Sequence, residues 1–218
     1  GWIDFNKNGA KDVYEDPQAD TEARIDDLMR QLTLEEKAGQ LLVQLGWPLY
    51  ERQGEELRLT EEAEKVLVKQ GSGGLWGFMR ADPWTQKTLT NGLNPQKAVE
   101  ATNLLQRYCI EHTRLGIPLL LSEECPHGHM AIGATSFPTG IGQASTWNPD
   151  LLRRMGEAQA TEIRKQGGHI GYGPVMDLAR DARWSRVEEG FGEDPYLSAQ
   201  LGMAVVRGMQ DNPDCPVI

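Results

Sequence analysis

The chain has few cysteines and no long apolar segment. Cys109, Cys125 and Cys215 are scattered and form no CxxC pair, which argues against a disulfide framework or a zinc site. No run approaches the roughly 20 apolar residues that a membrane-spanning helix needs. The net charge of -10 gives no basic surface for nucleic acid or an anionic membrane. We therefore expect neither as a partner.

Several sequence motifs are also missing. No glycine loop of the P-loop or dinucleotide-binding type follows an expected strand, and no G-x-S-x-G elbow is present. The N-terminus has no signal-peptide pattern, although Gly1 can follow a removed leader. We expect an extracellular or periplasmic location, with a cytoplasmic one left open.

What is present is an alternation of short apolar runs and amphipathic segments. Strands are expected at 74–78, 117–121 and 170–173, Val217-Ile218 resembles the start of another, and residues 46–73 show no clear strand. Helices are expected at 95–115, at 149–167 and from Asp194-Pro195 onward. This order predicts an α/β fold with a parallel sheet buried on both faces. Polar residues after each strand favour the rim of a (β/α)8 barrel, which has eight units in roughly 250 residues. The chain holds about four or five of them, so we expect the first part of a barrel at 20–218.

Residues 1–19 form an N-terminal extension with a calcium-loop-like motif. The run DFNKNGAKDVYE fits D-x-[DN]-x-[DN]-G-x5-E, with Gly9 at the turn. A calcium ion there would be bound by Asp4, Asn6, Asn8, Ala10, Asp12 and Glu15. A polar turn that ligates nothing is the alternative. Two helices should follow, one capped by Asp20 and one opened by the capping box of Thr33 and Glu36.

The long connection 174–196, PVMDLARDARWSRVEEGFGEDPY, carries three arginines and six acids. A charged connection of that length is usually functional or disordered. Trp184, Phe191 and Tyr196 give it side chains that can pack, so we expect an ordered polar site.

The order of several motifs resembles glycoside hydrolase family 3. They are Leu115-Gly-Ile-Pro, His127-Gly128, Phe137-Pro138, Ser145-Thr-Trp-Asn-Pro149, Arg180-Asp-Ala-Arg-Trp-Ser-Arg186 and Gly192-Glu-Asp-Pro195, with Thr33-Leu-Glu-Glu-Lys37 near the start. The resemblance covers about residues 14–210. It implies a retaining exo-acting β-glycosidase acting on terminal glucose or xylose, with a (β/α)8 first domain and no required cofactor.

The resemblance also implies roles for single residues. Glu124, where the family usually has Asp, and Arg186 would bind hydroxyls of the terminal sugar. A carboxylate accepts and a guanidinium donates paired hydrogen bonds, which suits vicinal hydroxyls. Glu189 is expected to hold Arg186. His127 is placed near the site, and Trp184 either stacks on a sugar or packs. Two departures, Ser185 in the R-W-S-R run and Met130, where many members have arginine, leave the sugar unspecified.

The resemblance places no catalytic residue in this chain. The nucleophile, the acid/base and a Lys-His sugar-binding pair belong to later segments of the family, so residues 1–218 alone should be inactive. The remaining part of the enzyme, as a second polypeptide or a further segment, is then an expected partner alongside the carbohydrate substrate. Two alternatives stay open: a non-catalytic carbohydrate-binding or scaffold fragment, and another barrel hydrolase that uses carboxylates such as Glu124 and Asp177.

Overall fold

A parallel four-stranded sheet organises the computed structural model, which describes residues 1–218. Its order is β1 (Val43–Leu45), β4 (Gly74–Trp76), β5 (Leu120–Glu124) and β6 (Ile170–Tyr172), so neighbours in the sheet are also consecutive parallel strands along the chain. The Ile218 amide donates to the His169 carbonyl (3.1 Å), and the Ile218 carbonyl accepts from Gly171 (2.9 Å). Residue 218 therefore pairs with β6 as the next parallel strand of a barrel would.

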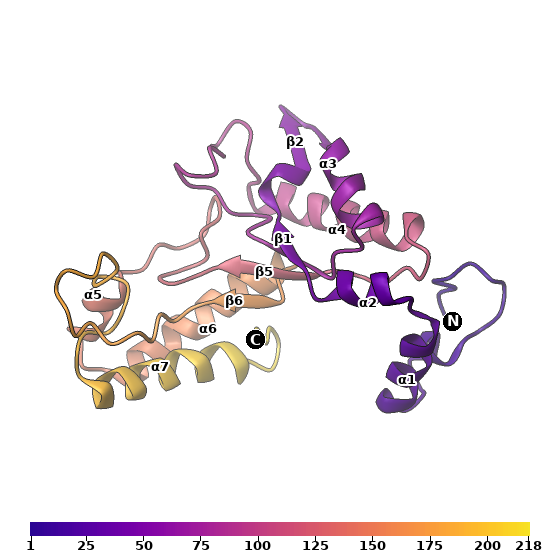
Figure 1. The fold of residues 1–218 in the computed structure, drawn as a ribbon. Coiled ribbons are helices and arrows are strands. Elements are labelled where there is room, and N and C mark those ends of the chain that lie inside the picture. The colour runs from indigo at the N-terminus through magenta and orange to yellow at the C-terminus, as the bar shows by residue number, and fades with distance from the viewer.

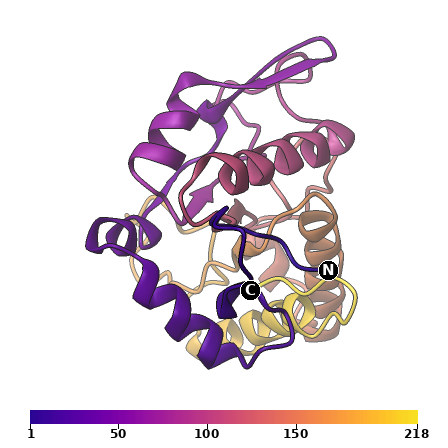
Figure 2. The ribbon, with the colours of Figure 1, turned by 90° about the vertical axis from the view of Figure 1, so that its right-hand side faces the viewer.

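Helices precede and connect the strands. They are α1 (Thr21–Gln31), α2 (Leu34–Gln40), α3 (Glu61–Glu64), α4 (Pro95–His112), α5 (Gly140–Ala144), α6 (Pro149–Lys165) and α7 (Pro195–Gln210), with short turns at Val13–Glu15 and Trp47–Leu49 and a π-helical turn at Lys65–Lys69. Of these, α4, α6 and α7 cover the outside of the sheet. Figures 1 and 2 both show α4 and the α6–α7 pair well apart, with the strands between them. No helix is both long enough and apolar enough to cross a membrane.

The two faces of the sheet have different surroundings. Leu75 and Leu121 are paired in register, are fully buried, and pack with Ala98, Ala101 and Leu105 of α4 in one hydrophobic core. A second core joins α6 and α7 through residues such as Ile163, Leu201 and Val205. Side chains alternate between faces along a strand, so Leu75 and Leu121 define the outer, helix-covered face.

The inner face is largely uncovered. One register row of this face contains Val43, Gly74 and Leu120. The row two residues further along the strands contains Leu45, Trp76, Ser122 and Ile170. Val43 and Leu120 are 52% and 53% exposed, although they are apolar strand residues. The expectation of a sheet buried on both faces is therefore met only on the outer one. The four strands curve without closing, so no strand lies opposite to cover the inner face.

The helix boundaries follow their capping signals. The Asp20 carboxylate accepts from the amides of Glu22 and Ala23, and Thr33 and Glu36 form both bonds of the capping box. Asn148 caps α6 at Leu151, and Asp194 caps α7 at Tyr196. Each cap satisfies backbone donors that the first helical turn leaves free, which explains why these starts were predictable.

The strand predictions needed three corrections. Residues 46–73, predicted to lack strands, contain the antiparallel hairpin β2 (Tyr50–Gln53) and β3 (Glu56–Leu59). β1 was not predicted, because it is only three residues long and its two apolar side chains, Val43 and Leu45, are exposed on the open face. The predicted strand 117–121 lies three residues later, at Leu120–Glu124. That shift places Glu124 in the strand itself and not in the loop after it.

Candidate functional site

The carboxyl ends of the strands bring polar side chains together at one rim. Glu124 is the last residue of β5, Trp76 the last of β4 and Tyr172 the last of β6. Glu124 and Tyr172 are register partners, and Trp76 pairs with Ser122, two residues before Glu124. All three side chains therefore belong to the inner face, where an open barrel presents its ligands.

Two adjacent glutamates at this rim have opposite surroundings. Glu123 points to the outer face, is fully buried, and accepts from the Met79 amide at 3.3 Å through both carboxylate oxygens. Burial raises the pKa of Glu123 to about 8. Glu124 points to the inner face and keeps about a fifth of its side chain exposed. Only Glu124 can reach a ligand at the rim.

The Glu124 carboxylate is held through one oxygen. Its Oε2 accepts from Trp76 Nε1 at 3.0 Å and from an Arg80 guanidinium nitrogen at 3.4 Å. Burial raises the pKa of Glu124, and the Arg80 charge and the Trp76 hydrogen bond oppose that rise. The group is thus a desolvated carboxylate with fixed donors, which is suited to accepting hydrogen bonds from a ligand.

A cluster of aromatic rings and one ion pair surrounds these donors. The Arg80 guanidinium lies over the rings of Trp76 (5.2 Å) and Trp84 (4.8 Å) and donates from Nε to Asp82 Oδ2 at 2.6 Å. Trp47 packs on Trp76 and Trp84, and Tyr172 stacks on Trp76 at 6.3 Å. The cluster is built from the ends of three strands and fixes the wall beside Glu124.

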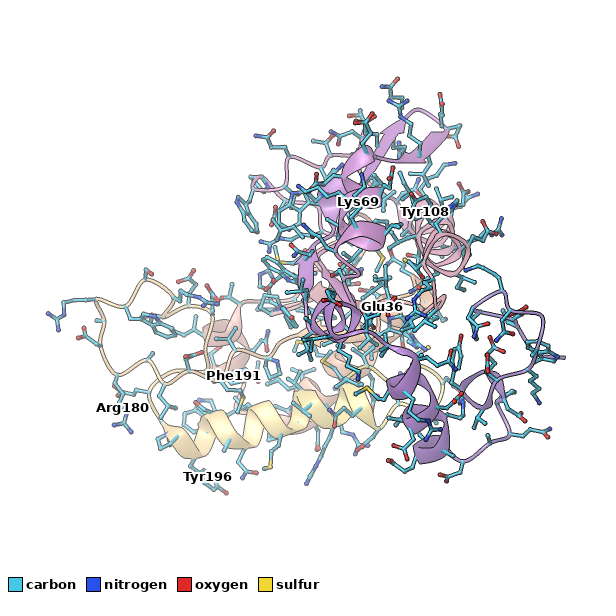
Figure 3. The ribbon with its side chains drawn as sticks, turned by 45° about the vertical axis from the view of Figure 1, so that its right-hand side comes forward. Glu36, Lys69, Tyr108, Arg180, Phe191 and Tyr196 are labelled. Carbon is cyan, nitrogen blue, oxygen red and sulfur yellow. The ribbon has the colours of Figure 1, made fainter.

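Residues 174–194 of the connection form a loop without helix or strand, and Pro195 and Tyr196 already belong to α7 (Figure 3). Arg186 and Glu189 form a two-pronged ion pair, with Nε to Oε1 at 2.9 Å and a terminal nitrogen to Oε2 at 2.6 Å. Phe191 is buried in the core beside α7, whereas Tyr196 is 73% exposed and does not anchor the loop as expected. Phe191 and the Arg186–Glu189 ion pair therefore help to hold this segment in place.

The loop lies close to the rim glutamate. Arg186 and Glu189 are both near enough to influence the pKa of Glu124, in opposite directions. The pKa of Glu189 is lowered, first by its hydrogen bond to Arg186, and His127 contributes a further small lowering. The structure therefore brings Glu124, Arg186, Glu189 and His127 into one region. Trp184 is half-buried and its role stays a prediction.

The short helix α5 supports Glu189 from behind. A Cβ atom at Gly140 would lie 2.0 Å from the Glu189 carbonyl oxygen, and the Ile141 amide donates to the Glu188 carbonyl at 3.2 Å. The two backbones are in direct contact, which only glycine at position 140 allows.

Sequence reasoning did not identify Trp76 as a site residue. Arg80 and Asp82 are among the polar residues that follow this strand in the sequence, but the sequence does not show their partners. The alternation of side chains along β4 could have predicted the position of Trp76, because it places Trp76 on the same face of the sheet as Glu124, the last residue of β5. The hydrogen bond between Trp76 and Glu124 joins residues 48 positions apart, which no local pattern shows.

The N-terminal loop adopts a compact turn held by its own side chains. Asp4 accepts from the amides of Asn8 (3.2 Å) and Gly9 (2.9 Å), and Gly9 has a φ of +80°. Glu15 is buried and accepts from Phe5 (2.7 Å) and Asp12 (3.0 Å). No group of three or more His, Cys, Asp or Glu side chains is arranged to hold a metal ion. Calcium binding by Asp4, Asn6, Asn8, Ala10, Asp12 and Glu15 stays a prediction.

The chain matches the model of the glycosyl hydrolase family 3 N-terminal domain over residues 33–218. It is 33% identical over 202 residues to a putative β-xylosidase of Formosa agariphila, covering 92% of this chain and 25% of that protein. It is 30% identical to a periplasmic β-glucosidase of Salmonella typhimurium, covering 87% of this chain and 21% of that protein. The chain thus spans about a quarter of the length of these relatives, which are glycoside hydrolases.

Solved structures give the same result. A β-glucosidase from Erythrobacter marinus superposes with a TM-score of 0.74 at 29% identity, covering 92% of this chain and 24% of that one. An exo-1,3/1,4-β-glucanase from Pseudoalteromonas superposes with a TM-score of 0.70 at 27% identity, covering 96% of this chain and 24% of that one. The parallel βα repeats, the ordered motifs and the matched family model agree. The chain belongs to glycosyl hydrolase family 3, as part of its N-terminal barrel domain.

Proposed function

We propose that residues 1–218 supply sugar-binding residues to an exo-acting, retaining β-glycosidase that removes terminal β-linked glucose or xylose. Glu124 accepts from hydroxyl groups of the terminal sugar, and Arg186 donates to them. Glu189 and His127 border that site, and Glu189 fixes the plane of the guanidinium.

The observation that carries this proposal is the convergence of Glu124 and the Arg186–Glu189 pair at the carboxyl rim of the sheet. These groups come from segments more than 60 residues apart in the sequence, between Glu124 and Arg186. A sugar ring presents neighbouring hydroxyls that both donate and accept, so an anchored carboxylate beside an anchored guanidinium complements it.

The bond-breaking groups are assigned to other segments of the enzyme. A retaining glycosidase needs two carboxyl groups about 5–5.5 Å apart, one as nucleophile and one as acid/base. At the rim of this chain, Glu124 is already bound through Oε2 by Trp76 and Arg80, Asp82 is bound by Arg80, and Glu189 is bound by Arg186. A carboxylate held in this way is suited to binding a hydroxyl group.

The partner of the inner face is the remaining set of barrel strands. Val43, Leu45 and Leu120 expose apolar side chains on that face, and barrel strands opposite would bury them. These strands belong to the enzyme itself, on the same or a second polypeptide. An extracellular or periplasmic location is supported by relatives named as periplasmic β-glucosidases.

The test compares two arginines of one loop in the complete protein that carries residues 1–218. Arg186→Ala removes the proposed sugar ligand. Arg183→Ala removes an exposed arginine that pairs only with Asp181, two residues away. Charge-assisted hydrogen bonds contribute roughly 1.5–3 kcal/mol, so Arg186→Ala should lower kcat/KM on aryl β-glucosides or β-xylosides by roughly 10- to 100-fold. Arg183→Ala should change it by less than about twofold, because exposed pairs contribute little.

Equal effects of the two substitutions would contradict the role of Arg186. Sugar binding without turnover by the complete protein would favour a non-catalytic carbohydrate-binding module instead. Calorimetry with glucose and xylose, run beside the activity assay, separates that outcome from the proposed one.

A further inference from the structure

The two oxygens of the Glu124 carboxylate are not equivalent. Oε2 accepts from both Trp76 Nε1 (3.0 Å) and Arg80 (3.4 Å), and no hydrogen bond reaches Oε1. A carboxylate oxygen has two lone-pair directions, so two donors fill Oε2. Only Oε1 keeps its full capacity to accept.

Both donors are themselves held in place. The side chain of Arg80 is 14% exposed, and its Nε is bound to Asp82 Oδ2. Asp82 accepts from the Thr85 amide at 2.8 Å, and the Asp82 amide donates to the Thr85 hydroxyl at 3.1 Å. Although burial acts to raise the pKa of Asp82, its bonds to Thr85 and Arg80 lower it overall. Asp82 is therefore a fixed anion that orients the guanidinium.

The aromatic rings limit the movement of the same groups. The guanidinium lies over two rings, and Trp76 contacts Trp47, Trp84 and Tyr172. A ring packed on three neighbours keeps its rotamer, so its N–H keeps its direction toward Glu124. The backbone adds a further restraint, since the Ala81 amide donates to the Met130 carbonyl at 2.9 Å.

We propose that Trp76 and Arg80 are positioning residues for sugar recognition: they bind Oε2 of Glu124 and thereby aim Oε1 at a hydroxyl group of the terminal sugar. This inference rests on the proposed role of Glu124 as a sugar ligand. It adds that the sugar hydroxyl is accepted through one oxygen and that the direction of that oxygen is set from the end of the neighbouring strand.

The arrangement also keeps the carboxylate charged. Arg80 and Trp76 stabilise the ionised form against the desolvation that raises the pKa of Glu124. Removal of either donor should raise that pKa further. As the pH falls, these variants should therefore lose sugar binding at a higher pH than the wild type does.

The experiment is a double-mutant cycle in the complete protein. Trp76→Phe keeps the ring and removes the N–H, and Arg80→Met keeps most of the side-chain volume and removes the charge. Each is combined with Glu124→Ala. The readouts are the glucose dissociation constant from calorimetry and the pH profile of kcat/KM on an aryl β-glucoside. Trp147→Phe, which changes a 70% exposed tryptophan outside the rim, is the matched control.

We expect Trp76→Phe and Arg80→Met each to weaken glucose binding by roughly 3- to 30-fold, and to have no further effect once Glu124 is alanine. The acidic limb of the kcat/KM profile should move to higher pH in Arg80→Met and be partly restored in Arg80→Lys. Trp147→Phe should leave both readouts unchanged.

Three results would overturn the inference. If the effects of Trp76→Phe or Arg80→Met persist undiminished in the Glu124→Ala background, these residues act on the fold and not through Glu124. If neither substitution changes binding while Glu124→Ala abolishes it, Glu124 needs no positioning and only this inference fails. If Glu124→Ala binds glucose as the wild type does, the proposed sugar role of Glu124 fails, and this inference fails with it.

Discussion

At the residue scale, two neighbouring glutamates, Glu123 and Glu124, lie in opposite environments. Glu123 and Glu124 differ by one position in a strand, so one side chain faces the helix-covered core and the other the open face. Burial raises the pKa of Glu123 to about 8, and no salt bridge compensates its charge. The protonated acid is therefore the form that the fold accommodates at neutral pH.

This protonation predicts how stability depends on pH. The folded state keeps a proton on Glu123 up to about pH 8, whereas an unfolded chain releases it near pH 4.5. The stabilising contribution is fully present below about pH 4.5 and is lost as the pH rises toward 8. Glu123→Gln should remove this component, so its melting temperature should fall less than that of the wild type between pH 4.5 and 8.

Circular dichroism melts across that range test the prediction. Glu188→Gln, at an exposed acid of the long loop, should follow the wild-type curve. Parallel curves for Glu123→Gln and the wild type would show that Glu123 titrates as an ordinary glutamate.

At the element scale, the site depends on close backbone contact between α5 and the loop that carries Arg186. Gly140 begins α5 and contacts the Glu189 carbonyl, whereas a Cβ at Gly142 would meet only the side chain of Pro138, at 3.0 Å. The short helix α5 has no apolar stripe, but its first residue, Gly140, lies against the backbone of the loop that carries Arg186 and Glu189.

Gly140→Ala should displace Glu189 and with it Arg186. We expect KM for an aryl β-glucoside to rise by about tenfold, with destabilisation of roughly 1–3 kcal/mol from overpacking. Gly142→Ala, in the same helix, is the matched control and should change KM by less than twofold. Similar KM values for the two variants would mean that the α5 contact does not position the ion pair.

The N-terminal loop gives a second prediction at this scale. If calcium binds Asp4, Asn6, Asn8, Ala10, Asp12 and Glu15, saturation at 100 times the dissociation constant adds about 2.7 kcal/mol to stability. The melting temperature should therefore rise when calcium replaces a chelator. Asp4→Ala should abolish that increment, whatever its effect on the metal-free protein. An equal increment in both proteins would place calcium elsewhere, and no increment would leave a polar turn.

At the scale of the whole molecule, the four strands form an arc with a covered outer face and an exposed apolar inner face. Figures 1 and 2 show α4 and the α6–α7 pair apart from each other, with the strands between them. Leu45 and Tyr172, both 43% exposed, continue the open face toward the rim where the site lies. Under the proposed function, Glu124 and Arg186 would line one wall of the sugar site, and further barrel strands would supply the opposite wall.

Residues 1–218 alone should show no turnover of aryl β-glucosides or β-xylosides, because the chain offers no catalytic carboxyl pair at the rim. They should also self-associate, since an open sheet edge and an apolar face are exposed. Size-exclusion chromatography with the activity assay tests both. Mixing with the remaining barrel strands should restore a monodisperse, active species; clear turnover by the isolated chain would contradict the assignment.

The sequence by itself determined the class of fold, the helix starts and the family. Caps such as Asn148-Pro149 and Asp194-Pro195 act within one turn, and the motifs near Glu124 and Arg186 are contiguous, so local patterns were sufficient. The β2–β3 hairpin and β1 were missed because short, half-exposed strands have no clear periodicity. The separation of Glu123 from Glu124 and the bond from Trp76 to Glu124 needed the tertiary structure. Both depend on strand register, which is set by packing between segments distant in the chain.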